Sequence, residues 1–389
     1  MLKPPACTDS VLIVLPWSPE LPGGVSVVVR NLLRIWTAEG KLARVIVSDW
    51  NAQRPTLDAN GDTTFRFAIF GKLSPLSLAK SLISAPRQLW RTWRLLKSHR
   101  ITAVNFHYPS LDALGIAVLR RLGLFKGQLV LSFHGTDVRS PSTPSEILLW
   151  RCVFNMSTAV TTCSKTLAHE VALAYKVTEA SISVIYNGVD ASLFHPKAAS
   201  SSAIPQPQAK PYIVSIGSYI PRKGHCLLLD AFAKVLPLHA GLRLVIVGMD
   251  GSERATLLIR AEALGLLEDI TLRVNLKPDE VAVVVAGATL CVQPSTAEPF
   301  GLAVIEAGAC GVPVLASAVG GHVELIADHQ NGCLFAPGDV TQCAEKILYM
   351  LMNGDAADQM AERFRSEIQV KYTWPVCANA YRQRLEAHP

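Results

Sequence analysis

Charged residues, aromatic residues and long apolar runs are scarce in this chain of 389 residues. Charged residues make up 17% and aromatic residues 7%, whereas 50% of the residues are hydrophobic, and this balance excludes an intrinsically disordered protein. The apolar runs, such as residues 11–16, fall far short of the ~20 residues of a membrane-spanning helix. Residues 1–10 carry a lysine, two prolines and an aspartate, which favours a first strand over a signal peptide.

Cysteine motifs for metal or disulfide chemistry are missing as well. The nine cysteines stand at positions 7, 152, 163, 226, 291, 310, 333, 343 and 377, and no two of them form a C-x-x-C pair. We therefore expect reduced core cysteines, no structural metal and no disulfide, and this usage favours a cytoplasmic protein.

Acidic residues are absent between Asp62 and Asp112. Residues 1–200 contain 22 Lys and Arg against 12 Asp and Glu, whereas residues 201–389 contain 15 against 19. The first half of the chain is therefore expected to meet an anionic partner.

Short apolar runs alternate with helical patterns from end to end. The expected strands cover residues 11–15, 45–48, 104–106, 129–133 and 159–162, then 213–216, 244–247, 290–293 and 314–316. Continuous apolar runs suit parallel strands that are buried on both faces, so the predicted class is α/β and doubly wound.

The segment 197–211 is rich in Ser, Pro and Gln and predicts a linker between two domains. The expected division is an N-terminal domain over residues 1–196, this linker, a C-terminal domain over residues 212–372, and a final helix over residues 373–389 that could return to either domain. Two such domains would leave a cleft at the carboxyl ends of both sheets, where open α/β sheets bind ligands.

Two loops of the N-terminal domain follow expected strands. Gly23 and Gly24 precede an apolar helix, and such a turn lets backbone N–H groups approach an anion, although a plain turn fits equally well. His134, with Asp137 nearby, follows the strand over residues 129–133 and could bind a hydroxyl or a developing charge. His107 ends another strand and is a weaker candidate.

Two loops of the C-terminal domain carry charged residues. Arg222 and Lys223 follow the strand over residues 213–216, and this pair suits a diphosphate, although two solvated loop cations are the alternative. Glu298 lies in the loop after residues 290–293, and Glu306 lies in the helix that begins near Phe300 and Gly301. A helix start between two carboxylates can hold phosphate while the carboxylates accept from sugar hydroxyls.

These motifs together resemble glycosyltransferase family 4, whose architecture of two Rossmann-like domains is called GT-B. The resemblance covers nearly the whole chain and rests on separated motifs in family order: Tyr186-Asn187-Gly188-Val189-Asp190, Phe194-His195-Pro196, Gly217 with Arg222-Lys223-Gly224, Glu298-Pro299-Phe300-Gly301, the Glu298-to-Glu306 spacing, Gly311-Val312-Pro313-Val314 and Gly320-Gly321.

The resemblance implies a role for each matching position. Gly23 and Gly24 would lie under the donor diphosphate, and His134 would face the reaction centre. Arg222 and Lys223 would neutralise the leaving group. Glu298 would hold sugar hydroxyls, with the backbone of Phe300, Gly301 and Leu302 nearby, and Glu306 would bind the ribose. Family members retain the anomeric configuration and need no metal; accordingly the sequence has no Asp-x-Asp pair.

Two positions depart from the family pattern. Ser218 stands where an arginine is common, so Arg222 would have to supply that charge. Val274 stands where the base-side loop usually has a glycine, so no base contact is carried over.

The segment over residues 72–100 is basic and carries two tryptophans. Arg87, Arg91 and Arg94 share one helical face, and Pro86 is expected to start or kink the helix. An adjacent apolar stripe comprises Leu82, Pro86, Leu89, Trp90, Trp93 and Leu96. This pattern predicts contact with an anionic membrane surface. A helix with core tryptophans is the alternative, and nucleic acid is not an expected partner.

The expected protein is thus a retaining hexosyltransferase that uses a UDP-, GDP- or ADP-sugar, without a further cofactor or metal. It would glycosylate a lipid-linked or polysaccharide acceptor at the cytoplasmic membrane face. A nucleotide-sugar epimerase and a non-catalytic nucleotide-sugar-binding scaffold are the alternatives.

Overall fold

The chain forms two compact units, which we describe separately. The computed structural model describes residues 10–386 apart from 53, 59–60, 70–74, 140, 142, 197 and 199–210. One unit comprises Met1–Tyr186 and Trp374–Pro389, and the other comprises Asn187–Thr373. Residues 187–196, which we expected in the N-terminal domain, therefore belong to the second unit. The expected linker lies outside the described residues except for residues 198 and 211.

The first unit contains an eight-stranded sheet in the order β3-β4-β2-β1-β5-β6-β7-β8. Its strands are β1 (Ser10–Leu15), β2 (Leu42–Ser48), β3 (Thr56–Leu57), β4 (Thr63–Phe65), β5 (Ile101–His107), β6 (Gln128–Phe133), β7 (Ala159–Thr162) and β8 (Ile182–Val184). Every neighbouring pair is parallel except β3 and β4. The central strands are buried on both faces because their apolar runs are unbroken.

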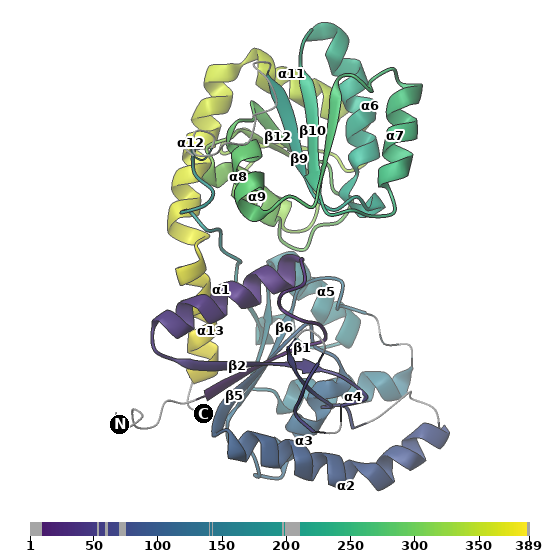
Figure 1. Ribbon diagram of the computed structural model, residues 1–389, viewed down its shortest axis with the longest axis vertical. Coiled ribbons are helices and arrows are strands. Elements are labelled where there is room, and N and C mark those ends of the chain that lie inside the picture. Colours follow the sequence, from purple (N-terminus) through teal and green to yellow (C-terminus); the bar gives the residue numbers. More distant parts are fainter. Residues whose placement is uncertain are drawn as a thin grey trace. The chain divides into compact units, whose positions relative to one another are not determined.

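Helices cover both faces of this sheet (Figure 1). Helix α1 (Gly24–Ala38) packs against α13 (Trp374–Glu386), so the final helix of the chain is part of the first unit. A second series, in which each helix packs on the next, consists of α2 (Pro75–Ser98), α3 (Leu114–Arg121), α4 (Pro144–Met156) and α5 (Lys165–Tyr175).

The second unit contains a six-stranded parallel sheet in the order β11-β10-β9-β12-β13-β14. Its strands are β9 (Tyr212–Ile216), β10 (Arg243–Gly248), β11 (Ile270–Val274), β12 (Leu290–Gln293), β13 (Val314–Ser317) and β14 (Cys333–Phe335). Helix α6 (His225–Val235) packs against α7 (Arg254–Ala263) and α11 (Val340–Met352). Helix α9 (Leu302–Ala309) packs against α8 (Pro278–Ala286), α12 (Gly354–Lys371) and the short α10 (His322–Leu325).

The doubly wound α/β class is confirmed, and every strand that we expected from an apolar run is present. The sequence pattern did not predict β3, β4, β8, β11 or β14. These strands are short or lie at sheet edges, where partial exposure breaks the apolar run.

Two further observations concern the cysteines and the helices. All eight described cysteines are free thiols, and Cys163, Cys291, Cys310, Cys333, Cys343 and Cys377 are buried; Cys7 lies outside the described residues. Among the described helices, none combines the length and apolar character required to cross a membrane.

Helix α2 differs from its prediction in two ways. Pro86 lies inside the helix rather than at its start, so the helix continues although this residue donates no backbone hydrogen bond. The buried side chains of its C-terminal half are Gln88, Thr92, Leu95 and Leu96, whereas Trp90 is 53% exposed. The expected apolar stripe is therefore only partly the buried face. Lys72 and the side chains of Lys80 and Leu82 lie outside the described part.

Candidate active site

In the second unit, two loops meet at the point where the order of the strands reverses. Strands β9 and β12 are neighbours in the sheet, but the chain leaves them toward opposite edges. Such a switch point is the usual ligand site of an open α/β sheet. The loop after β9, residues 217–224, carries Arg222 and Lys223, and the loop after β12, residues 294–301, carries Glu298. The topology therefore brings together charged residues that lie far apart in the sequence.

Backbone contacts hold these two loops to one another. The Thr296 N–H donates to the Arg222 carbonyl at 2.8 Å, and the Thr296 hydroxyl contacts the same oxygen at 3.3 Å. Gly224 has a φ of +70°, and a Cβ placed on it would lie 2.0 Å from the Pro294 carbonyl oxygen. The loops thus approach at a distance that only glycine permits at this position.

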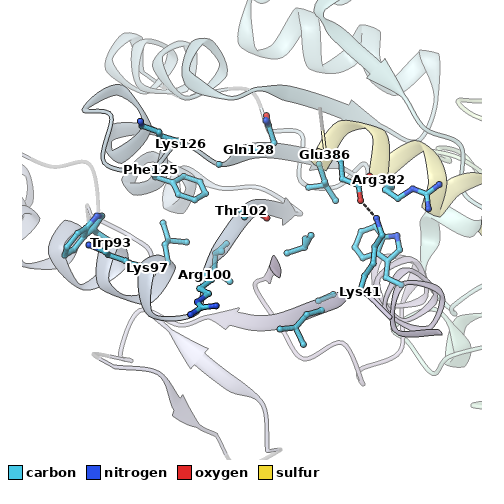
Figure 2. Close-up of a pocket in the computed structure, with 18 of the residues that line it drawn as sticks. Lys41, Trp93, Lys97, Arg100, Thr102, Phe125, Lys126, Gln128, Arg382 and Glu386 are labelled. Atoms are coloured by element: carbon cyan, nitrogen blue, oxygen red, sulfur yellow. Dashed lines mark hydrogen bonds and ion pairs between the residues drawn. The ribbon is translucent and has the colours of Figure 1, made fainter. Parts of the chain in front are cut away.

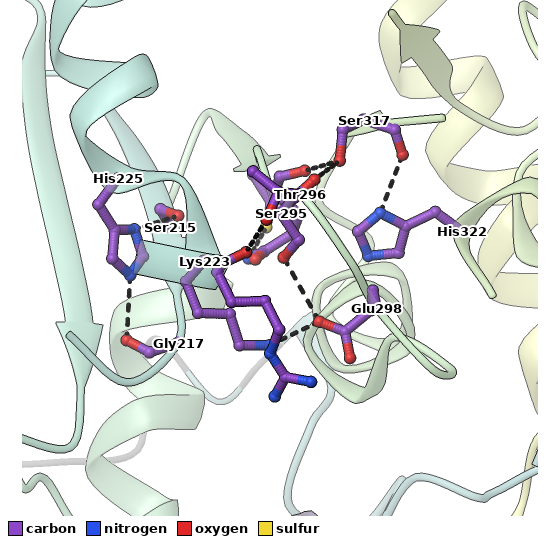
Figure 3. A network of polar contacts seen from close by, with 12 residues as sticks. Ser215, Gly217, Lys223, His225, Ser295, Thr296, Glu298, Ser317 and His322 are labelled. Carbon is purple, nitrogen blue, oxygen red and sulfur yellow. Dashed lines mark hydrogen bonds and ion pairs between the residues drawn. The ribbon is translucent and has the colours of Figure 1, made fainter. Parts of the chain in front are cut away.

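Lys223 and Glu298 form an ion pair between the loops (Figure 3). The Lys223 Nζ lies 2.6 Å from Glu298 Oε2, and the two side chains are only 17% and 14% exposed. Burial alone would raise the pKa of Glu298, but Lys223, His322 and Arg222 together outweigh it and hold this pKa below its ordinary value. Glu298 is therefore ionised at neutral pH, and its second oxygen can accept from another donor.

A third loop, after β13, fixes the backbone around Glu298. The Gly321 N–H donates to the Glu298 carbonyl at 2.8 Å. Cβ atoms placed on Gly320 and Gly321 would lie 2.0 Å from the Glu298 carbonyl and 2.2 Å from the Phe300 carbonyl. The two glycines are thus required by the close approach of two backbones.

His322 follows these glycines and is 1% exposed. Its Nδ1 lies 3.0 Å from the Ser317 carbonyl, to which Nδ1–H donates, and Figure 3 shows the ring beside Glu298. Burial is the main cause that lowers the pKa of His322. From the sequence, Gly320 and Gly321 were expected as family motifs, whereas no role was expected for His322.

Helix α9 begins at this site with open backbone donors. Gly301 precedes its first residue with a φ of +111°, and no side chain caps the helix. Phe300 is 3% exposed, so the backbone near Leu302, rather than the phenyl ring, is what a ligand could reach. Uncapped N–H groups and the helix dipole favour an anion here. Glu306, half-buried on the same helix, has its pKa raised to about 7 by burial, with Lys223 acting against this shift.

In the first unit, His134 and the glycine pair lie at the carboxyl edge of the sheet. His134 follows the last residue of β6, and Gly23 precedes α1 with a φ of 149° and no side-chain cap. The carboxylate of Asp137 accepts from the N–H groups of His134 and Gly135, at 2.9 and 2.6 Å, so it shapes the loop rather than contacting the imidazole. Burial raises the pKa of Asp137 to about 6.

His107 is buried and contacts His134 rather than the surface. The His107 Nδ1 lies 2.9 Å from His134 Nε2, and the rings stack with centroids 5.1 Å apart. Burial lowers the pKa of His134 to about 4, and burial and His134 lower that of His107. Both rings are therefore neutral at pH 7. His107 is a support for His134, not a separate strand-end site.

A buried hydrogen-bond chain fixes the direction of this histidine pair. Ser132 Oγ donates to Asn105 Oδ1 at 2.8 Å, and Asn105 Nδ2 lies 2.9 Å from His107 Nε2. If this amide donates, His107 carries its proton on Nδ1 and gives it to His134 Nε2. His134 then holds its own proton on Nδ1. Near His134, the Tyr108 hydroxyl lies 3.1 Å from the Thr136 hydroxyl.

The two departures from the family pattern can be placed in the second unit. Ser218 lies in the loop after β9, and Arg222, half-buried, is near enough to Glu298 to lower its pKa. The residue after Val274, Asn275, adopts a left-handed φ of 55°. Asparagine tolerates this conformation better than other non-glycine residues, so the chain turns there without a glycine.

One group of described residues has the composition of a metal site. Oxygen, nitrogen and sulfur atoms of Asp328, His329 and Cys333 lie within 4.8 Å of one another. The Lys346 ammonium lies 2.7 Å from His329 Nε2 and 3.5 Å from Asp328 Oδ2. A cation already neutralises this group, which lies outside the loops described above.

Comparisons with known proteins agree with this geometry. The family described as Glycosyltransferase Family 4 matches residues 22–193, and the one described as Glycosyl transferases group 1 matches residues 197–367. The chain belongs to the family 4 glycosyltransferases. The resemblance drawn from the sequence motifs is thus confirmed.

The relatives differ in how much of their length is matched. D-inositol 3-phosphate glycosyltransferase of Segniliparus rotundus is 36% identical over 39% of this chain and 35% of that protein. Phosphatidyl-myo-inositol mannosyltransferase of Mycobacterium leprae is 26% identical over 94% of both chains.

Solved structures show the same fold at low identity. A glycosyltransferase of Rickettsia africae has a TM-score of 0.76 at 18% identity over 97% of this chain and 99% of that chain. Anabaena HepE in complex with UDP-glucose has a TM-score of 0.72 at 20% identity over 96% and 99%. The fold is that of the GT-B glycosyltransferases.

Proposed function

We propose that this chain transfers a sugar from a nucleotide-diphosphate sugar to an acceptor hydroxyl, with retention of the anomeric configuration and without a metal. The observation that carries the proposal is the Lys223–Glu298 pair at the switch point of the second unit, beside the uncapped start of α9. HepE, which was solved with UDP-glucose, supports a nucleotide-sugar donor.

The donor would be held by opposite charges on opposite sides of its glycosidic bond. Lys223, Arg222 and the N–H groups at the start of α9 would neutralise the diphosphate as it leaves. Glu298 would accept from sugar hydroxyls, and Glu306 from the ribose. A charge-assisted hydrogen bond contributes about 1.5–3 kcal/mol, so these carboxylates would give the site its selectivity for a sugar nucleotide.

The first unit would supply the acceptor side of the reaction. His134 is neutral and its Nδ1–H, set by His107, is available as a hydrogen-bond donor. It would orient a hydroxyl or stabilise negative charge, not act as a covalent nucleophile. Gly23 and Gly24 would let the backbone at the start of α1 approach the donor diphosphate.

A binding screen tests the donor. Nucleoside diphosphates and their sugars should raise the melting temperature, since a ligand at 100 times its Kd stabilises a protein by about 2.7 kcal/mol. Wild-type turnover in both Lys223→Ala and Glu306→Ala would contradict the proposal. Product formed from nucleotide sugar without any acceptor would indicate an epimerase, and binding without any turnover would indicate a scaffold.

We further propose that the enzyme works at the cytoplasmic face of a membrane on a lipid-linked or polysaccharide acceptor. Helix α2 supports this proposal, because a hollow of about 430 Å³ beside the exposed Trp90 has no acidic residue among its lining. Four arginines, Arg54, Arg87, Arg91 and Arg94, line it together with His99. Burial and the neighbouring Arg87 and Arg54 lower the pKa of Arg91, so an anionic surface would relieve repulsion within this cluster. The relative named phosphatidyl-myo-inositol mannosyltransferase gives further support.

Vesicle co-sedimentation tests the membrane proposal. Binding should increase with the fraction of anionic lipid and fall in the double variant Arg91→Glu, Arg94→Glu. The exposed Arg151 on α4 gives a matched control, and Arg151→Glu should bind as the wild type does. Vesicle binding that depends neither on lipid charge nor on Arg91 and Arg94 would refute the membrane proposal without affecting the donor proposal.

A further inference from the structure

A pocket of about 1040 Å³ lies at the edge of the first unit's sheet that is opposite to His134. It is built where parallel strands begin, and Val11 of β1, Ala43 of β2, Ile101 of β5 and Gln128 of β6 line it. His134 follows the last residue of β6, and a strand of this length spans roughly 20 Å. The pocket is therefore separate from the candidate active site.

Apolar side chains form the floor and part of the rim of this pocket. Trp36 and Leu96 are each 3% exposed, and Phe125 and Leu385 are also buried. At the rim, Leu124 is 53% exposed. A floor of buried aromatic and aliphatic side chains that continues to an exposed leucine suits an alkyl chain.

The charged side chains of the pocket are mostly cationic. Lys41, Lys97, Arg100, Lys126 and Arg382 line it, whereas Glu386 is the one acidic side chain among the described lining residues. Glu386 is paired with Lys41. Figure 2 shows Lys97, Arg100 and Lys126 on the side of the pocket away from that pair. This side is complementary to an anion.

Helix termini explain only part of this charge. Lys97 lies in the last turn of α2, where a cation stabilises the helix dipole, and its Nζ also lies 4.8 Å from the centre of the Trp93 ring. Lys126 lies beyond the end of α3, is exposed, and has no ion-pair partner among the described residues. Apart from Thr102, Gln128 and the paired Glu386, the lining side chains are apolar or cationic, so a polar ligand such as a sugar would find few side-chain acceptors here.

We propose that this pocket binds one anionic lipid, with its chain on the apolar floor and its phosphate beside Lys97, Arg100 and Lys126. The ligand class follows from the combination of a buried apolar floor with a cationic side, and it does not depend on glycosyl transfer. The distance from His134 means that the lipid would be a bound effector or anchor, not the acceptor.

Calorimetric titration with dodecyl phosphate, below its micellar concentration, tests the proposal on the full chain. Dodecyl phosphate should bind at least tenfold more tightly than either inorganic phosphate or neutral dodecyl maltoside. Lys97→Gln and Lys126→Gln should each weaken it by about tenfold, the value of one charge-assisted contact. Leu124→Ser, at an exposed position, should weaken it as well.

The matched control is Arg151→Gln, which removes an exposed charge from α4, outside the lining of the pocket, and should leave the affinity for dodecyl phosphate unchanged. If inorganic phosphate binds as tightly as dodecyl phosphate, the pocket is a surface anion site. If dodecyl maltoside binds as tightly as dodecyl phosphate, the pocket is an apolar site without selectivity for an anion. Either result, or full affinity in both lysine variants, would overturn the proposal. The affinities for dodecyl phosphate, inorganic phosphate and dodecyl maltoside are measured without turnover and without vesicles.

Discussion

Replacing Gly224 by alanine should separate the two loops that form the donor site. Gly224 ends the loop that carries Lys223, and its φ of +70° is in the left-handed region. A Cβ at this position would lie 2.0 Å from the Pro294 carbonyl oxygen and 2.9 Å from its carbonyl carbon. Because both neighbours are backbone atoms, no side chain can rotate away, and the loops themselves have to move.

The size of the effect follows from two separate costs. An alanine in the left-handed region costs about 1–2 kcal/mol. Non-bonded heavy atoms normally lie about 3.5 Å apart, so the loops would have to separate by roughly 1 Å or more, and overpacking of this kind costs a further ~1–3 kcal/mol. A displacement of about 1 Å in a site can lower turnover by about 100-fold.

Gly265 provides the control for this experiment. Its φ is +68°, and no atom lies within 4 Å of a Cβ placed on it, so Gly265→Ala carries the backbone cost alone. Urea unfolding and nucleotide affinity should be measured for both variants. We expect Gly265→Ala to lose about 1–2 kcal/mol of stability with unchanged nucleotide affinity. Gly224→Ala should lose more stability than this and should also bind nucleotide more weakly than the wild type. Equal stability losses with wild-type affinity in both variants would refute the proposed loop contact.

Three further predictions concern charge and tautomer. Lys223→Met leaves the buried Glu298 without its cation, so the pKa of Glu298 should rise and the free energy of unfolding in urea should fall by about 3 kcal/mol. Adding Glu298→Gln to this variant should largely restore the stability, and an unchanged urea midpoint in Lys223→Met would contradict the prediction. Burial raises the pKa of Glu306 from 4.5 to about 7, so its ionisation costs stability as the pH rises through this range. Because a ribose hydroxyl donates best to the carboxylate, nucleotide affinity should rise through about pH 7, and Glu306→Gln should remove this increase relative to the wild type. His107→Phe keeps an aromatic ring but removes the donor to His134, so ¹⁵N spectra should show mixed tautomers of His134 and turnover should fall. His107→Gln keeps a donor and should retain one tautomer of His134, and identical spectra in both variants would exclude the positioning role.

The fold class could be predicted from the sequence because parallel strands buried on both faces leave a direct record in the chain. The apolar runs at residues 11–15, 129–133 and 290–293 all became strands. The edge strands β3 and β14 left no such record, because strands of two and three residues are too short to be told from a loop by their pattern. The family motifs likewise located the loops that follow β9, β12 and β13.

Helix α2 shows why a helical pattern does not settle which face is buried. Its periodicity placed Trp90 in an apolar stripe, but Trp90 is 53% exposed and Thr92 is 1% exposed. The neighbouring α3 and β5 decide which side of the helix is covered. A pattern of apolar residues defines candidate faces, and only the packed neighbours choose between them.

The sequence by itself determined the α/β class, the family and the loops that carry Arg222, Lys223 and Glu298. Only the tertiary structure decided which of these side chains touch, because Lys223 and Glu298 are 75 positions apart and meet only when β9 and β12 become neighbours in the sheet. The same holds for His107, whose place at the end of a strand made it a weaker candidate for a site residue. Its neighbours in β6 and α13 bury it, and burial turns a candidate ligand residue into a support for His134.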